Sequence, residues 1–146
     1  MIVRCKTISL HDIASDYRMP TGMYGRGRAT VEALTVGKLY AVYAMHFLQA
    51  QIYYYVCTDD YRDYPPLHYP MHQGAPLFDI VSGVVSRSWA LSDAGKFGVY
   101  LAPKEWLGSD GFFDRLTDGD DAEVIRKWRA IKSRIDDEAA SEMPMT

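Results

Sequence analysis

Two apolar, strand-forming runs lie close together in this chain and lead directly into an acidic loop. Residues 38–47 (KLYAVYAMHF) and 52–58 (IYYYVCT) alternate side chains between two faces, and residues 59–64 (DDYRDY) follow without a break. Both faces of the first run are largely apolar, so a strand here must be covered twice, by a sheet that folds over on itself or by a helix. The two runs predict a hairpin, although Gln49-Ala50 lacks the Asn-Gly signal of a tight turn.

Composition is typical of one cytoplasmic domain spanning residues 1–146. The net charge is −3 with 48% hydrophobic residues, which disfavours both disorder and direct nucleic-acid binding. No run of about 18 apolar residues predicts a membrane span, and the amino terminus lacks the apolar core of a signal peptide. Cys5 and Cys57 lie far apart in probable strands, so we expect two buried free thiols. Eleven tyrosines favour strands and interfaces alike.

The rest of the first hundred residues reads as short strands separated by loops. Alternation at 2–8 predicts a strand, and the glycine-containing stretch 9–34 predicts a long irregular excursion. In the 59–74 loop, three prolines are expected to prevent a regular ladder. The runs 75–81 and 84–91, joined by Ser82-Gly83, predict a second hairpin, and a further short strand is expected at 97–101.

Helical patterns begin after Pro103. A helical turn is expected at 103–107 and a short helix at 110–116. Asp120 and Glu123 resemble the capping box of a longer helix. We expect this helix to fray from about Asp136, where acids oppose the helix dipole, and residues 136–146 to form a disordered tail. Its apolar face follows helical spacing: Val124, Trp128, Ile131 and Ile135.

The titratable residues do not form a convincing active site. His68 and His72 would share a helix face, but the neighbouring prolines disfavour a helix, so we predict no metal. His46 reads as a hydrogen-bonded sheet residue, and His11 lacks an accompanying nucleophile pattern. We therefore predict neither catalytic residues nor a cofactor, and the chain is not expected to be an enzyme.

The acidic loop is either a solvated turn or a docking surface for another protein. In the second interpretation, carboxylates steer a basic partner while tyrosine rings supply rigid contact area. The residues predicted to bind the partner are Tyr55, Asp59, Asp60, Tyr61, Asp63, Tyr64 and Trp89.

Three segments resemble a group of small bacterial proteins with SH3-like β-barrels. They are 34–43 (LTVGKLYAVY), 53–60 (YYYVCTDD) and 75–83 (APLFDIVSG), and the segment 106–116 is also similar. Such proteins resemble immunity proteins encoded beside polymorphic toxins of the contact-dependent and type VI kinds. The resemblance implies an α+β fold, mainly antiparallel, with five or six strands in a small SH3-like barrel and carboxy-terminal helices packed against it.

The resemblance implies binding to a cognate toxin protein, whose active site would be covered or distorted. Two alternatives remain open. One is a small ligand-binding or enzymatic barrel with a cleft under the 9–34 loop, using His11, Asp12 and Arg26. The other is a homodimer or larger assembly, in which the tyrosines bury against a second copy.

Overall fold

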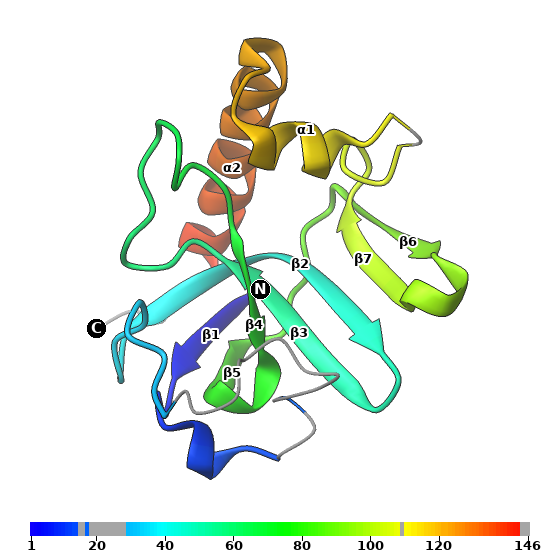
Figure 1. Cartoon of the computed structure of the whole chain (residues 1–146). Helices are drawn as coiled ribbons and strands as arrows, with labels where there is room; N and C mark the ends of the chain where they lie inside the picture. Colours follow the sequence, from blue (N-terminus) through cyan, green and yellow to red (C-terminus); the bar gives the residue numbers. More distant parts are fainter. Residues whose placement is uncertain (15–16, 18–28, 109, 144–146) are drawn as a thin grey trace.

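In its described residues, the chain folds into an α+β structure with a seven-stranded sheet and two α-helices (Figure 1). The computed structural model describes residues 1–14, 17, 29–108 and 110–143. Every strand pairing is antiparallel. The strands and helices are β1 (Ile2–Cys5), β2 (Leu39–Leu48), β3 (Gln51–Val56), β4 (Met71–Gly74), β5 (Phe78–Ser82), β6 (Trp89–Asp93), β7 (Val99–Pro103), α1 (Phe112–Asp118) and α2 (Ala122–Ser141).

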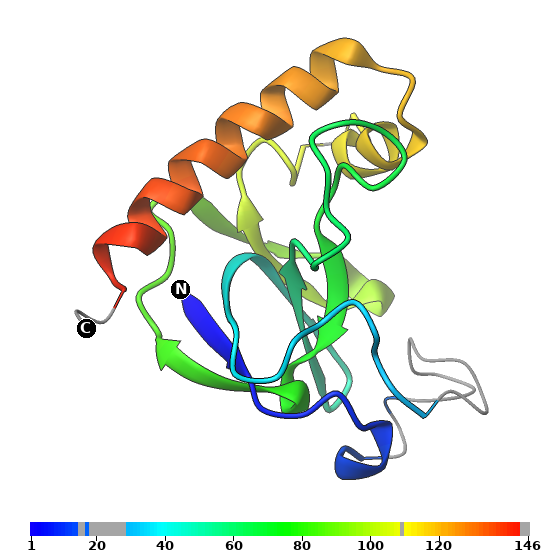
Figure 2. The same ribbon diagram turned by 90° about the vertical axis from the view of Figure 1, so that its left-hand side faces the viewer.

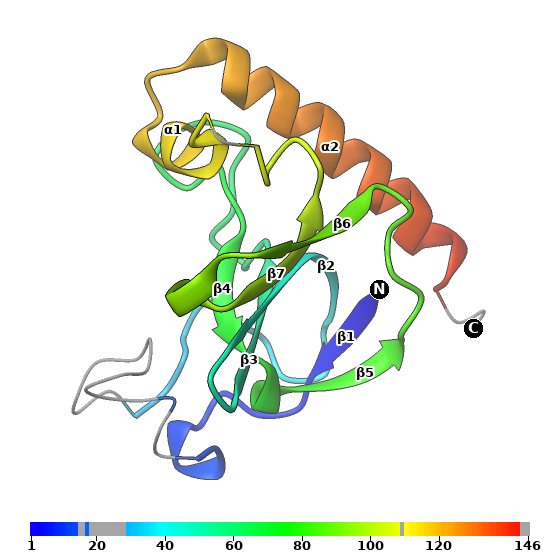
Figure 3. The same cartoon turned by 90° about the vertical axis from the view of Figure 1, so that its right-hand side faces the viewer.

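Strand β2 organises the sheet because it is long enough to pair with three other strands. One of its edges pairs with β3 through residues 42–48. Its other edge pairs first with β1, where Ala41 faces Ile2, and then with β7, where Met45 faces Leu101. The sheet therefore divides into two arms, with β5 beyond β1 and β6 beyond β7 (Figure 3).

The predicted hairpin at β2 and β3 is confirmed. Leu48 pairs with Gln51, which leaves Gln49-Ala50 as a two-residue turn. Gln49 has a φ of 55°, the positive value that such turns require. The two long strands impose this turn on a sequence without glycine or asparagine.

Two predictions about pairing are wrong. The second predicted hairpin does not form, because β5 pairs with β1 on one arm and β6 pairs with β7 on the other. Residues 83–88 instead connect the arms. The 59–74 loop does contain a strand, because its prolines at 65, 66 and 70 all precede β4, which pairs with β3.

Seven strands replace the five or six expected, and in the described residues the sheet does not close into a barrel. Strands β4, β5 and β6 each have one paired neighbour. Of the predicted 9–34 excursion, residues 15–16 and 18–28 lie outside the described part. Leu10–Asp12 form a 3-10 helix, and Ser9 bridges Thr30.

Two separate hydrophobic clusters cover the two faces of β2, as its doubly apolar pattern predicts. Tyr40 and Val42 belong to a cluster with β1, β3 and β5. Tyr43 and Ala44 belong to the other cluster, which α1 and α2 complete. Figure 2 shows α2 lying along one side of the sheet, with α1 near its start.

Helix α2 buries the predicted face of Val124, Trp128, Ile131 and Ile135. Its N-cap is Asp121 instead of Asp120, and the Asp121 side chain accepts a hydrogen bond from the backbone N–H of Val124. The helix continues past Asp136 to Ser141, since Asp136 pairs with Lys132 and Ala139 packs in the core. In the described part of the chain, neither helix has the length and apolarity to cross a bilayer.

The predicted short elements near α1 are partly confirmed. Residues 103–107 form turns, with N–H groups of Trp106 and Leu107 bonded three residues back. The short helix expected at 110–116 forms two residues later, as α1, and buries Phe112 and Leu116. It ends at Gly119, whose φ of 78° suits a left-handed C-cap.

Candidate partner-binding surface

Five of the seven predicted partner residues come together in the loop that follows β3. We use the name docking surface for this 59–64 loop together with the adjoining polar face of α2, which consists of Arg129, Lys132, Ser133, Asp136 and Asp137. Two adjoining hollows of about 460 and 470 Å³ lie along it and share Lys132 and Asp136 in their walls. The loop and the helix thus form one continuous surface.

Asp59 anchors the loop to the sheet. Its carboxylate accepts hydrogen bonds from Thr35 Oγ1 at 2.6 Å and from Tyr40 at 2.9 Å, and it pairs with Lys38 Nζ at 2.6 Å. Partial burial alone would raise the pKa of Asp59, but these three donors outweigh burial and lower that pKa. Asp59 is therefore a positioning residue whose charge is already compensated.

Tyr61 joins the loop to the buried side of α2. The indole Nε1 of Trp128 donates to the Tyr61 hydroxyl at 3.3 Å. Lys132 Nζ lies 5.1 Å from the centre of the Tyr61 ring, within the range of a cation–π contact. Burial raises the pKa of Tyr61, so the group stays a neutral phenol. Tyr61 is partly buried, so only part of its side chain is open to a partner.

Arg129 clamps the far end of the loop. It donates a hydrogen bond to the carbonyl oxygen of Asp63. Its guanidinium lies 4.9 Å from the centre of the Tyr64 ring. Tyr64 is nevertheless 70% exposed, which makes it the most open aromatic ring on this surface. An exposed ring held by a cation is a suitable contact residue, because little rotational freedom is left to lose on binding.

The charge of the docking surface is mixed, with an excess of acid. It holds five carboxylates and three cations, the third being Arg62 in the loop. Lys132 pairs with Asp136 at 2.7 Å, and the Tyr43 hydroxyl also donates to Asp136. Asp60, Asp63 and Asp137 form no ion pair with any described residue. These three carboxylates carry the charge available to a basic partner.

Tyr55 and Trp89 do not belong to the docking surface, so this part of the prediction is corrected. Trp89 is 8% exposed and packs in the cluster that contains β1 and β5. Tyr55 is 7% exposed and contacts Trp106 and Phe113 beneath α1. Alternation along a strand cannot distinguish an outward ring from one covered by a helix.

The helix residues were missed by the sequence analysis. Arg129, Lys132, Ser133, Asp136 and Asp137 follow the i, i+3, i+4, i+7, i+8 spacing of one helix face, so the signal was present. The same pattern is typical of an ordinary solvated helix face, and nothing local in the sequence indicates that the 59–64 loop packs beside it.

Three of the four histidines, His46, His68 and His72, occupy structural positions. His46 is hydrogen-bonded within the sheet as predicted, through Phe97 O at 2.6 Å and His72 Nε2 at 3.2 Å. His68 is buried and bonds to Leu116 O. Among the described residues, no three His, Cys, Asp or Glu side chains converge as metal ligands.

The cleft proposed under the 9–34 loop falls partly on positions that the structure does not describe, Arg26 among them. His11 and Asp12 are exposed, and Asp12 accepts a hydrogen bond from Thr7 Oγ1 at 2.6 Å.

The surroundings of the two free thiols disfavour the reactive thiolate form. Cys5 is buried and Cys57 is half-buried, and burial raises the pKa of Cys57 to about 12.

Comparisons of the chain with protein-family models, with curated proteins and with solved structures found no match.

Proposed function

We propose that this chain is an immunity protein that binds a cognate bacterial toxin domain in the cytoplasm and neutralises it through the docking surface. The observation that carries the proposal is the fixation of the 59–64 loop at three points, by Lys38, Trp128 and Arg129. A loop held in this way loses little conformational entropy on association, so its open groups can contribute fully to affinity.

The chemistry of the surface favours a basic protein partner. Asp60, Asp63 and Asp137 supply unpaired negative charge, and Tyr64 supplies exposed aromatic area. Complementary charge accelerates association and selects against acidic partners. The proposed mechanism is occlusion, in which the surface covers the catalytic face of the toxin. No chemical step by this chain is required.

We also propose that the sheet is an open relative of the SH3-like barrel that the sequence resembles. This proposal is supported by two features: β2 is shared between the two arms of the sheet, and β3 ends in the acidic loop. This position matches the acidic strand end in the resembling proteins.

The test uses the protein encoded by the neighbouring reading frame as the partner. Its toxicity on expression in bacteria, the rescue by this chain and the affinity of the purified pair are measured. Asp60→Lys combined with Asp137→Lys should weaken binding about tenfold or more and slow association, because attractive charges become repulsive. Glu32→Lys combined with Asp118→Lys is the matched control, with the same charge change at exposed positions elsewhere.

The Asp60 and Asp137 pair is preferred to Asp59, because replacing Asp59 would also release the loop from the sheet. Unchanged affinity and protection in the first double variant would remove this face from the interface. Failure of the unmodified chain to bind or protect against that toxin would remove the proposed function itself.

A further inference from the structure

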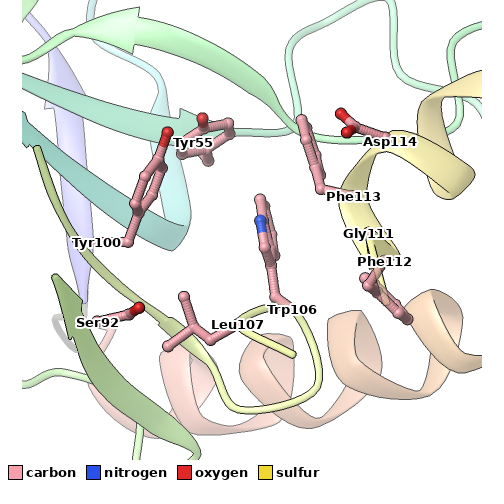
Figure 4. A pocket seen from close by; sticks show the side chains of 9 residues that line it. All are labelled: Tyr55, Ser92, Tyr100, Trp106, Leu107, Gly111, Phe112, Phe113 and Asp114. Carbon is pink, nitrogen blue, oxygen red and sulfur yellow. The ribbon is translucent and has the colours of Figure 1, made fainter. Parts of the chain in front are cut away.

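A further cavity, apart from the two hollows of the docking surface, lies beneath α1, with walls that come from β3, β6, β7, the segment that leads into α1 and the start of α1 (Figure 4). Its volume is about 270 Å³. Pockets for drug-sized ligands begin at about 300 Å³, so this cavity suits a small ligand or one group of a larger ligand. Of the residues predicted to bind a partner, only Tyr55 lines it.

Two aromatic rings stand on opposite sides of the cavity, Tyr100 from β7 and Trp106 from the segment after it (Figure 4). Each ring is supported from behind. Tyr100 stacks on His46 with 4.1 Å between ring centres and 3° between planes. Trp106 stacks on Phe113 with 4.6 Å and 5°. This backing fixes both rings, so the remaining face of each is presented to the cavity without rotational freedom.

Tyr55 closes one end of the cavity and completes the aromatic lining. Its ring centre lies 5.1 Å from that of Trp106 in an edge-on arrangement. Burial raises the pKa of Tyr55, and a hydrogen bond with Tyr100 raises it further. Both phenols are therefore neutral at physiological pH, and the cavity presents ring faces and hydroxyl groups.

Asp114 is the single charged side chain among the described residues that line the cavity. It is exposed, and it forms no ion pair with any described residue. Burial raises the pKa of Tyr100, a hydrogen bond with Tyr55 lowers it, and the charge of Asp114 raises it. Since no lysine or arginine of the described residues lines the cavity, these walls offer an anionic ligand no cationic partner.

We propose that this cavity binds a methylated ammonium group. Aromatic faces attract cations through their quadrupole, and methylation weakens hydration, so the cost of leaving water is low. A primary ammonium is more strongly hydrated, so the cost of moving it from water to these aromatic walls is higher. The Asp114 carboxylate adds attraction at the rim. The site is separate from the docking surface and does not depend on a toxin partner.

The proposal is tested by titrating the full chain with tetramethylammonium, choline and 3,3-dimethyl-1-butanol, which is the neutral carbon isostere of choline. Tryptophan fluorescence and NMR shifts of the Trp106 indole N–H report occupancy. We expect both cations to bind with dissociation constants of about 1 mM or below, and the isostere to bind at least about tenfold more weakly. Equal binding of the isostere, or no shift at about tenfold higher cation concentration, would overturn the proposal.

Substitutions distinguish the contribution of the aromatic ring faces to cation binding from any effect on folding. Tyr100→Phe keeps the ring and should keep binding, whereas Tyr100→Leu should abolish measurable binding. Asp114→Asn should weaken cation binding about three- to tenfold. Asp118→Asn, which removes the same charge from the same helix outside the cavity, should have no effect. Circular dichroism checks that each variant is folded, and equal losses in Tyr100→Phe and Tyr100→Leu would contradict the cation–π assignment.

Two sources could supply such a group, a free choline-type molecule and a trimethylated lysine side chain. Parallel titrations with choline and with a short peptide that carries trimethyl-lysine distinguish them by relative affinity. Tighter binding of the peptide would assign the cavity to a modified protein tail. Tighter binding of choline would assign it to a small molecule, and binding of neither would remove the site.

Discussion

The indole N–H of Trp128, on the buried face of α2, donates a hydrogen bond to the Tyr61 hydroxyl, with 3.3 Å between the two atoms. Trp128 is fully buried, and Tyr61 belongs to the docking surface. The core of the protein and its proposed binding loop are therefore mechanically joined at one polar contact. This contact gives the loop a fixed position that charge and aromatic character alone would not provide.

Replacing Tyr61 by Phe should lower the free energy of unfolding by about 1–2 kcal/mol, because the buried Trp128 N–H loses its acceptor. The ring and its packing are kept in this variant. Urea denaturation followed by tryptophan fluorescence gives the value. Tyr64→Phe is the matched control: Tyr64 is 70% exposed, so a change within about 0.5 kcal/mol is expected. Equal effects in the two variants would mean that the Trp128 contact contributes nothing.

A substitution at Leu116 tests how much the hydrophobic cluster between α1 and α2 contributes to stability. It is fully buried, so Leu116→Ala should destabilise the fold by about 2–5 kcal/mol through lost burial and a residual cavity. Leu91→Ala is the control, since Leu91 is 71% exposed on β6 and should cost less than about 0.5 kcal/mol. Thermal unfolding monitored by circular dichroism measures both. A small loss for Leu116 would show that α1 is not part of the cooperative core.

We expect His72 to make the free energy of unfolding depend on pH in the mildly acidic range. Burial lowers the pKa of His72 to about 3, and the nearby His46 lowers it as well, whereas the unfolded chain has the ordinary value of 6.5. The unfolded state therefore takes up a proton first. The contribution of His72 to the free energy of unfolding is complete above pH 6.5. It is lost as the pH falls from 6.5 toward 3, by at most about 1.4 kcal/mol for each pH unit.

The measurement is the free energy of unfolding between pH 7 and about pH 5.5, above the range in which most carboxylates titrate. His72→Gln should flatten this dependence, while His11→Gln, at an exposed position, should leave it unchanged. A wild-type protein whose stability is constant over this interval would contradict the assigned depression of the His72 pKa.

Local patterns predicted the elements well and their pairing poorly. The spacing of Val124, Trp128, Ile131 and Ile135 is a property of one helix, and the structure buries all four. The pairing of β5 with β1 involves residues far apart in sequence, and adjacent apolar runs around Ser82-Gly83 imitate a hairpin. Loop closure and competition between strand partners decide such pairing, and neither leaves a local signal.

The candidate site was partly predictable for the same reason. Acidic and aromatic residues at 59–64 are adjacent in sequence, so their gathering in one loop follows directly. The contribution of Arg129 and Lys132 comes from packing of α2 beside that loop, which tertiary structure alone determines. Tyr55 and Trp89 were misplaced because strand alternation does not reveal which face a helix or second sheet arm will cover.

Gly98 gives a test of how the two sheet arms are joined. It precedes β7 with a φ of +87°, and a Cβ at this position would collide with the carbonyl oxygen of Phe47 in β2. Gly37 has nearly the same φ, +86°, but no atom within 4 Å of such a Cβ. Gly37→Ala should therefore cost only the backbone strain, about 1–2 kcal/mol.

Gly98→Ala should cost at least about 2 kcal/mol more than Gly37→Ala, because β7 must move away from β2 to relieve the collision. Movement of β7 would also disturb the bond between His46 Nε2 and Phe97 O and the stacking of His46 on Tyr100. Denaturant unfolding measures the difference, and the His46 ring resonances report the displacement. Equal destabilisation by the two substitutions would mean that the arms are joined loosely enough to absorb the added methyl group, and that the close approach of Gly98 to β2 does not hold the β6–β7 arm in place.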